Sequence, residues 1–376
     1  MLVVDLQIPG CPPRPVGILK RPIARVEVVE KGGGLSKDDS LATRALAWDH
    51  GCLAVQTLAA MIGPATFVLD DGRQCNPLHI APWVLDPGSV ELPGILRKLR
   101  GEWPCVPFGS DAKRELSQGW TARGETFAGA DTPHGPSSNE VWRWIDAPDG
   151  ALALSLDYPE AHPVRSVTRR VTPDPNAAAI DFELAISVRR ECLLPIGLHP
   201  VFRVPSQAGA LRLSPARYDH GRTYPGTLEP GAVLFAENRR FQKLEEAPRR
   251  GGGTIDAAAL PFADNIEDLL QLVGADGELI LHYCNEGFRA RLTWDKTHFP
   301  SLLLWYSNRG RQAYPWSGRH LALGVEPICS AFDLGPAISA GPNPIAEAGT
   351  PTARRFTPNE TFVTRYRISV EPDDAD

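Results

Sequence analysis

The stretch Leu321-Ala322-Leu323-Gly324-Val325-Glu326-Pro327 decides how the rest of the chain is interpreted. Its apolar residues predict a buried strand, and Glu326 is the single charged residue within it. Proline cannot donate to a ladder and favours an extended conformation in the residue before it, so we expect the strand to end at Pro327 with Glu326 directed outward. Two interpretations stay open here: an edge-strand carboxylate paired with an arginine, and a carboxylate of a functional site.

The composition favours β-structure and gives no sign of a nucleic-acid or membrane partner. The 376 residues include 34 glycines and 36 prolines, which suits many short strands joined by turns better than a helical bundle. The net charge of -6 arises from 39 basic and 45 acidic residues spread along the chain. Because no basic stripe is present, we expect neither nucleic acid nor a membrane as a partner.

Cysteine usage and the N-terminal residues predict a cytoplasmic protein. The seven cysteines form no C-x-x-C pair and no regular spacing, which favours reduced thiols over a disulfide framework. The N-terminal apolar run contains Asp5 and Gln7 and follows no basic region, so it does not resemble a signal peptide. No stretch is long enough to span a membrane.

Short apolar runs separated by turn signals predict strands along most of the chain. They lie at 46–48, 53–58, 66–69, 151–158, 164–171, 179–188, 278–284, 288–294, 301–306 and 361–370. One helix is expected to begin at Asp264-Asn265-Ile266-Glu267, a capping-box-like pattern. We therefore predict an all-β fold of two large antiparallel sheets packed face to face, with function at their concave rim or in the loops.

The first part of the chain differs from the remainder. Residues 1–41 mix apolar pieces with proline- and glycine-rich ones, and we interpret them as an N-terminal arm or extension that adds one strand near 25–30. Residues 42–376 show no break in composition and are predicted to form a single domain.

Several common functional motifs are absent from the sequence. It contains no G-x-x-x-x-G-K-[ST], no G-x-G-x-x-G between a strand and a helix, no G-x-S-x-G and no H-E-x-x-H. Nucleotide-binding, serine-hydrolase and zinc-protease functions therefore lack support, and the sequence predicts neither a cofactor nor a metal.

Polar residues in apolar or proline-rich settings are the remaining candidates for a site. Arg100 precedes a rigid segment of prolines and aromatics and could offer donors to a ligand, or it could be a surface arginine before a buried loop. His134 precedes a glycine near Trp142 and Trp144, which is typical of a surface that binds sugars, but a histidine that caps a turn fits equally well.

Two further residues are candidates for the site, His199 because its setting is like that of Glu326 and Asp264 because it could bind a ligand. His199 precedes Pro200 at the end of an apolar run, as Glu326 precedes Pro327, so the two could face each other across a cleft as a proton donor and a proton acceptor. Asp264 could bind hydroxyls, or it could simply cap the predicted helix.

Four short motifs occur in order along the chain and point to a family. They are Arg100-Gly101-Glu102-Trp103-Pro104-Cys105 with Phe108-Gly109, His134-Gly135, Leu198-His199-Pro200-Val201-Phe202 and Val325-Glu326-Pro327. The first two resemble the Arg-Gly-Gly-x-Pro and His-Gly of hexose-6-phosphate mutarotases. The last two are similar to the His-Pro-Tyr-Phe and Glu-Pro of aldose 1-epimerases. The resemblance to this galactose mutarotase-like superfamily covers residues 42–371.

The resemblance implies a galactose mutarotase-like β-supersandwich with few short helices that interconverts the α and β anomers of an aldose without a cofactor. It implies that Glu326 is the base towards the anomeric hydroxyl and that His199 is the acid towards the ring oxygen. It further implies that His134 and Arg100 hold sugar hydroxyls and that Asp264 matches a substrate-binding aspartate. The expected partner is a small sugar, bound by a monomer or homodimer.

The chain departs from the family pattern in ways that leave other functions open. Gly135 is followed by Pro136-Ser137-Ser138, where the phosphosugar enzymes carry a Phe-Ala-Arg-like sequence, so an arginine expected near a phosphate is absent. The Asn-Arg pair of galactose-type enzymes is absent around Arg100. Since the same fold also serves non-catalytic carbohydrate-binding proteins, and related folds serve glycosidases and lyases, these functions remain alternatives.

Overall fold

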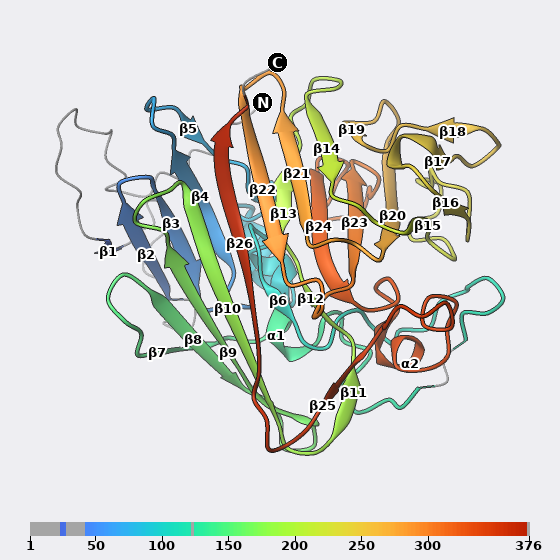
Figure 1. Cartoon of the computed structure of the whole chain (residues 1–376), viewed down its shortest axis with the longest axis horizontal. Helices are drawn as coiled ribbons and strands as arrows, with labels where there is room; N and C mark the ends of the chain where they lie inside the picture. Colours follow the sequence, from blue (N-terminus) through green and yellow to red (C-terminus); the bar gives the residue numbers. More distant parts are fainter. Residues whose placement is uncertain (1–22, 28–41, 122–123, 374–376) are drawn as a thin grey trace.

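The computed structural model describes residues 23–27, 42–121 and 124–373, and these residues are organised mainly as β-strands (Figure 1). Three antiparallel sheets of nine, eight and five strands make up most of the fold. The predicted all-β class with large antiparallel sheets and few short helices is therefore confirmed.

The nine-stranded sheet joins strands from the middle and the end of the chain. In Figure 1 the red strand β26 runs between β10 and β22, with which it pairs on its two sides. The order is β19 (Ala259–Leu260), β14 (Leu211–Pro215), β21 (Glu278–Tyr283), β22 (Phe288–Trp294), β26 (Phe362–Pro372), β10 (Ala179–Val188), β9 (Val164–Pro173), β8 (Leu152–Asp157) and β7 (Arg143–Ile145). The C-terminal strand thus links the two halves of the sheet.

The eight-stranded sheet contains the stretch on which the sequence analysis is centred. Its order is β16 (Arg240–Phe241), β15 (His220–Thr223), β20 (Ile266–Val273), β23 (Ser301–Asn308), β24 (Leu321–Cys329), β12 (Ile196–Leu198) and β6 (Pro104–Cys105), and β13 (Val201–Arg203) also pairs with β24. Strand β24 is therefore central, with β23 on one side and β12 and β13 on the other.

The five-stranded sheet has the order β1 (Ala24–Glu27), β2 (Thr43–Trp48), β3 (Gly51–Gln56), β4 (Ile62–Val68) and β5 (Gln74–Cys75). Strand β1 pairs antiparallel with β2, so part of the predicted N-terminal arm forms an edge strand. The remainder of that arm, residues 1–22 and 28–41, lies outside the described residues. The division of the chain after residue 41 stays a prediction.

Small elements complete the described fold. Two strand pairs are β11 (Cys192–Leu194) with β25 (Arg354–Phe356) and β17 (Ala247–Pro248) with β18 (Thr254–Ile255). The helices are α1 (Gly135–Asn139) and α2 (Gly335–Ser339), with single turns of 3-10 helix η2 (Pro87–Glu91), η3 (Gly94–Arg97) and η4 (Leu244–Glu246).

The eight-stranded sheet separates two apolar cores. Side chains alternate between the faces of a strand, and on β23 this sends Leu302 and Leu304 into the core shared with the nine-stranded sheet. Leu303 and Trp305 point the other way, into a second core with Trp83 and other residues of the covering loops. A polar side chain on this second face therefore lies beneath loops rather than between the sheets.

The predicted helix at Asp264-Asn265-Ile266-Glu267 is wrong, because Ile266 begins strand β20. All eight residues of β20 are buried, and they pair with β15 on one side and β23 on the other. Its buried polar groups are satisfied across the fold; for example, the Asp268 carboxylate accepts hydrogen bonds of 2.9 Å from the amides of Leu234 and Phe235. Tertiary pairing thus overrides the local helix-start pattern.

The predicted end of the strand at Pro327 is also wrong, since β24 continues to Cys329. The pairing with β23 extends past the proline, with Leu302 opposite Pro327 and Ser301 opposite Ile328. A central strand accommodates the proline here because only one ladder bond is lost, on the side of β12.

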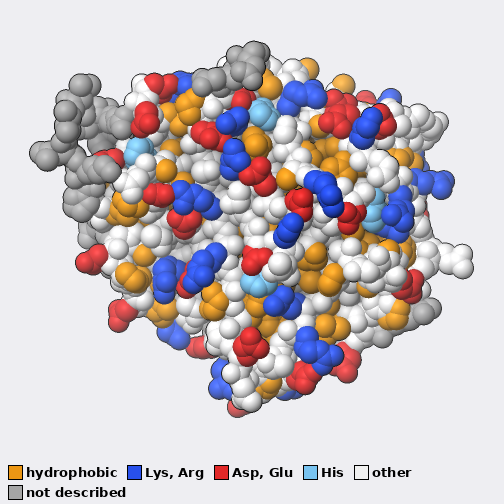
Figure 2. All heavy atoms as spheres, in the orientation of Figure 1, with side chains coloured by type: hydrophobic (Ala, Val, Ile, Leu, Met, Phe, Trp, Pro, Cys, Tyr) orange, Lys and Arg blue, Asp and Glu red, His pale blue; other side chains and the backbone are white. Residues whose placement is uncertain are grey.

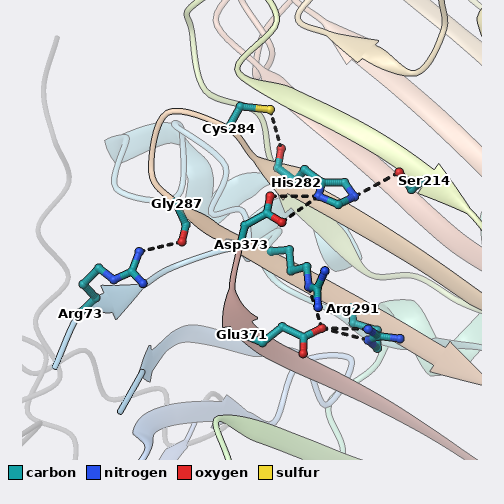
Figure 3. Close-up of polar contacts among 9 residues, drawn as sticks. Arg73, Ser214, His282, Cys284, Gly287, Arg291, Glu371 and Asp373 are labelled. Atoms are coloured by element: carbon teal, nitrogen blue, oxygen red, sulfur yellow. Dashed lines mark hydrogen bonds and ion pairs between the residues drawn. The ribbon is translucent and has the colours of Figure 1, made fainter. Parts of the chain in front are cut away.

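The outer face of the nine-stranded sheet is polar. In the orientation of Figure 1, basic and acidic side chains are mixed over the visible surface (Figure 2). Near the end of β26, the ring of His282 lies between Ser214 and Asp373, and Arg291 bonds to Glu371 (Figure 3). A face that carries such mixed polar and charged side chains is typical of one that meets solvent.

None of the six cysteines among the described residues forms a disulfide bond. In the same part of the chain, no helix has the length and apolar character needed to cross a bilayer.

Candidate active site

A cavity of about 560 Å³ lies against the second face of the eight-stranded sheet. Its floor contains Leu269 of β20, Leu303 and Trp305 of β23 and Glu326 of β24, and the covering loops form its walls. Its volume is within the range of about 300–1,000 Å³ that is usual for small-molecule sites. The cavity is therefore large enough for a sugar.

Glu326 and His199 face each other across adjacent strands on this floor. The register on the two sides, Gly197 opposite Ile328 and Val201 opposite Gly324, places position 199 opposite position 326. Nε2 of His199 lies 3.5 Å from Oε1 of Glu326. The two residues are 5% and 2% exposed, so a carboxyl group and an imidazole meet at a buried position on the cavity floor.

The surroundings of His199 fix its ring. It stacks on Trp103 with ring centroids 4.2 Å apart and an interplanar angle of 20°, and it meets Trp305 edge-on at 5.8 Å. Nδ1 is buried and has no hydrogen-bond partner among the described residues, while Nε2 faces Glu326. The ring therefore directs Nε2 towards the carboxylate and the cavity.

Burial moves the two pKa values apart. Desolvation, with the charge of Asp333 as a further cause, raises the pKa of Glu326 well above its usual value. Desolvation and the neighbouring His134 lower the pKa of His199 well below its usual value. Both shifts favour the uncharged forms, in which the pair shares one titratable proton and Glu326 carries it.

His134 joins this pair from the loop before α1. Its backbone has a left-handed conformation with φ of 58°, and its ring meets that of His199 edge-on at 5.1 Å. Nδ1 accepts a hydrogen bond of 3.2 Å from the amide of Gly109, so the proton of the neutral ring must be on Nε2. Burial lowers the pKa of His134 to about 4, which keeps the ring neutral with one N–H donor.

The structure does not bring the other two predicted residues into the cavity. The guanidinium of Arg100 is buried and donates to the carbonyl oxygens of Lys98 at 3.0 Å and Gly63 at 3.3 Å. Asp264 is exposed and lies 3.5 Å from Arg249. Neither residue lines the cavity, so the predictions that they bind substrate are not supported by their positions.

Other polar residues line the cavity instead. Nη1 of Arg114 donates to Oδ1 of Asp333 at 2.8 Å and to the Tyr224 hydroxyl at 2.9 Å, and all three residues line the cavity. No local sequence pattern identified them, because they come from three loops far apart in the chain and meet only in the folded protein.

A buried carboxylate supports one aromatic wall. Glu267, which is fully buried, accepts a hydrogen bond of 2.6 Å from the indole Nε1 of Trp305 and one of 2.8 Å from the Ser307 hydroxyl. The guanidinium of Arg311 lies 3.3 Å from the same carboxylate and over the ring of Trp316 at 4.6 Å. Trp305, Arg311 and Trp316 are thereby held together at the cavity surface.

Among residues 23–27, 42–121 and 124–373, no three His, Cys, Asp or Glu side chains are grouped as metal ligands would be.

Comparisons with known proteins identify the fold. No family model matches the sequence, and no curated protein matches it. The fold is similar to that of an Escherichia coli K12 protein provisionally named an aldose 1-epimerase, with a TM-score of 0.56, 15% identity, and 86% of this chain and 96% of that chain covered. It is also similar to a galactose mutarotase-like protein from Clostridium acetobutylicum, with a TM-score of 0.56, 12% identity, and coverage of 93% and 99%.

A third similar structure is the GalM/aldose epimerase homologue from C. elegans, with a TM-score of 0.56, 13% identity, and coverage of 86% and 96%. The predicted galactose mutarotase-like fold is therefore confirmed. At these identities the likeness concerns the fold, and the chemistry of this chain has to be argued from its own residues.

Proposed function

We propose that the protein is an aldose 1-epimerase-like isomerase that interconverts the α and β anomers of a sugar. The observation that carries the proposal is the pairing of Glu326 and His199, 3.5 Å apart at the floor of a sugar-sized cavity. A general acid and a general base on one small molecule are what ring opening of a hemiacetal requires.

The reaction needs only proton transfers around the sugar. The base takes the proton of the anomeric hydroxyl, the bond between C1 and the ring oxygen breaks, and the acid gives its proton to that oxygen. After rotation about the C1–C2 bond, the reverse transfers close the ring on the other face of C1. No cofactor or external reactant is needed for this balance.

We assign Glu326 as the base and His199 as the acid, as the resemblance implies. Ring opening by this assignment starts from the form in which His199 carries the shared proton, whereas burial favours the form in which Glu326 carries it, so the proton has to move within the pair before the base acts. Because closure reverses the two roles, the same single proton serves both directions.

The remaining walls suit a sugar. The Nε2–H of His134 is a neutral donor for a hydroxyl oxygen. Trp103 and Trp305 contribute apolar surface beside polar groups, an arrangement that fits the alternating apolar and hydroxylated surfaces of a pyranose. These features support binding and take no part in the proton transfers of the reaction.

The experiment is polarimetry of freshly dissolved aldoses. Wild-type protein should accelerate relaxation to the anomeric equilibrium, and Glu326→Gln should lower kcat by about 10²–10⁴-fold, the usual contribution of one acid or base. The exposed Glu347→Gln is the matched control and should retain wild-type activity. If wild-type protein accelerates no member of a broad panel of sugars and sugar phosphates, the proposal is rejected.

A second candidate is a carbohydrate-binding protein without turnover. The specific observation in its favour is that burial raises the pKa of Glu326, which reduces the amount of carboxylate base at neutral pH. Saturable sugar binding by calorimetry, without anomer exchange by NMR, would select this function over the isomerase.

A further inference from the structure

Each cation that lines the cavity is balanced by an acidic neighbour. Among the described residues, the lining contains two arginines, Arg114 and Arg311, and no lysine. Its acidic residues are Asp333 and Glu326, and burial shifts Glu326 towards its uncharged form. The other polar side chains of the lining, such as Thr132, are neutral, as are the two histidines whose pKa values burial lowers.

Arg114 is paired within the cavity. It forms an ion pair with Asp333 at 2.8 Å, and the side chains are 25% and 19% exposed, respectively. The charge of Asp333 is the main cause that raises the pKa of Arg114. Asp333 also affects the pKa values of Glu326 and His134, so the ion pair lies at the same end of the cavity as the acid and base.

Arg311 is also paired. Its Nε lies 3.3 Å from Oε1 of Glu267 and 4.0 Å from Oε2 of Glu229. The guanidinium is therefore within ion-pair distance of two carboxylates at the wall next to Trp316. Neither cation of the lining lacks an anionic neighbour.

This balance has different consequences for neutral and anionic sugars. A phosphate or carboxylate on the ligand would meet Asp333 or Glu267 as soon as it reached Arg114 or Arg311, so attraction and repulsion would largely cancel. A hydroxyl group both donates and accepts, and an arginine–carboxylate pair offers both kinds of partner. Helix α1, which follows His134, adds no cation, because it consists of Gly-Pro-Ser-Ser-Asn.

We propose that the cavity takes an uncharged aldose, and that Asp333 is the specificity-determining residue that excludes sugars with a phosphate or carboxylate by neutralising Arg114. This inference rests on the proposed function, since it names the class of substrate for the same site. It treats the Arg114–Asp333 pair as the polar clamp for sugar hydroxyls, in place of Arg100 and Asp264.

The test compares D-glucose and D-galactose with their 6-phosphates and with D-glucuronate. Binding is measured by calorimetry, and anomer exchange is measured separately by NMR. We expect wild-type protein to bind the neutral sugars at least tenfold more tightly than the anionic ones. Tighter or equal binding of the phosphates would overturn the proposal, whether or not any sugar is turned over.

Asp333→Asn provides the sharper arm of the experiment. It removes the carboxylate and leaves Arg114 with the Tyr224 hydroxyl as its partner, so the preference for neutral sugars should fall at least tenfold. Asp181→Asn is the matched control. Asp181 lies on the exposed face of β10, outside the cavity, and its carboxylate pairs with Arg367. An unchanged preference in folded Asp333→Asn would refute the role of Asp333.

The two measurements separate this inference from the proposed function. Preferential binding of neutral sugars without anomer exchange would refute the isomerase and leave the charge assignment supported. Faster exchange of the phosphosugars would refute the charge assignment and leave the isomerase supported. Circular dichroism of each variant establishes that it is folded before its affinities are compared.

Discussion

Replacing Arg169 by methionine should destabilise the protein strongly and in a pH-dependent way. Arg169 of β9 and Glu102 are both fully buried and form an ion pair through Nη2 and Oε2. Nη1 of Arg169 donates to the carbonyl of Ala60 at 2.6 Å, and the Tyr366 hydroxyl donates to Oε1 of Glu102 at 2.7 Å. The network connects the nine-stranded sheet to the segment that precedes β6, one residue before the tryptophan that stacks on His199.

The expected cost is about 3–5 kcal/mol, because removal of one partner leaves a buried, uncompensated charge. Burial raises the pKa of Glu102, and the charge of Arg169 opposes this rise. Without Arg169, the native pKa of Glu102 rises further above its unfolded value, so the contribution to stability is present at low pH and is lost as the pH increases. The loss is up to about 1.4 kcal/mol per pH unit for one proton.

The assay is denaturant unfolding, followed by the fluorescence of the nine tryptophans, at pH 5 and at pH 8. The cost of Arg169→Met should be larger at pH 8, and the additional change Glu102→Gln should remove this pH dependence. Arg170→Met is the matched control, because this neighbour pairs with Glu183 at 3.3 Å on the exposed face and should cost less than about 1 kcal/mol. An equal cost at both pH values would refute the reasoning, since it would mean that Glu102 is uncharged in the wild type.

Two further predictions concern the cavity and acid stability. Gly324→Ala would place a Cβ in steric conflict with Oε1 of Glu326 and 2.9 Å from Cβ of Trp305. Polarimetry should therefore give at least a tenfold loss of kcat, with a stability cost of about 1–3 kcal/mol. Unchanged activity would show that the carboxylate position is not critical. Burial lowers the pKa values of His79 and His134 to about 3 and about 4. The contribution of these two neutral rings to the free energy of unfolding is fully present above the unfolded pKa of about 6.5. It is lost as the pH falls towards the folded pKa values, by up to about 1.4 kcal/mol per pH unit for each histidine. The denaturant midpoint should therefore decrease between pH 6.5 and pH 4.5, and a constant midpoint would contradict the buried, neutral state of these rings.

Strands with regular alternation were the easiest part of the fold to predict. Residues 179–188 form β10 with the predicted bounds, because their burial alternates along a strand with one solvated face. Strand β20 was mistaken for a helix, since its Glu267, Asp268 and Gln271 look like solvent-facing residues in the sequence. All three are buried, with partners on distant segments that no local pattern reveals.

The site shows the same division between local and distant signals. Glu326, His199 and His134 could be singled out because each is a polar residue at an unusual local position, before a proline or a glycine. Arg100 met the same local criterion, but its donors are used by carbonyl groups of the nearby backbone. Arg114 and Asp333 have no unusual neighbours in the sequence, and their pairing depends on the meeting of two loops more than 200 residues apart.

The prolines explain why a partly wrong prediction about strand ends still pointed to two residues, Glu326 and His199, that lie close together. Pro327 was expected to end its strand, whereas β24 continues and pairs with β12 and β13 on both sides of the Glu326–His199 position. The amide of Val325 donates to the carbonyl of Pro200 at 2.8 Å, so by alternation the nitrogen of Pro327 faces the same neighbouring strand.

Pro200 and Pro327 have no amide hydrogen to donate, so one ladder hydrogen bond is missing on each side of the Glu326–His199 pair. The amide of His199 donates in the opposite direction, to Trp103, which makes the position shared by His199 and Glu326 a non-hydrogen-bonded pair, the kind whose side chains lie closest together. The motif X-Pro on two adjacent strands thus brings a carboxyl group and an imidazole together through strand register. The sequence signal is informative because of that register rather than because a strand ends there.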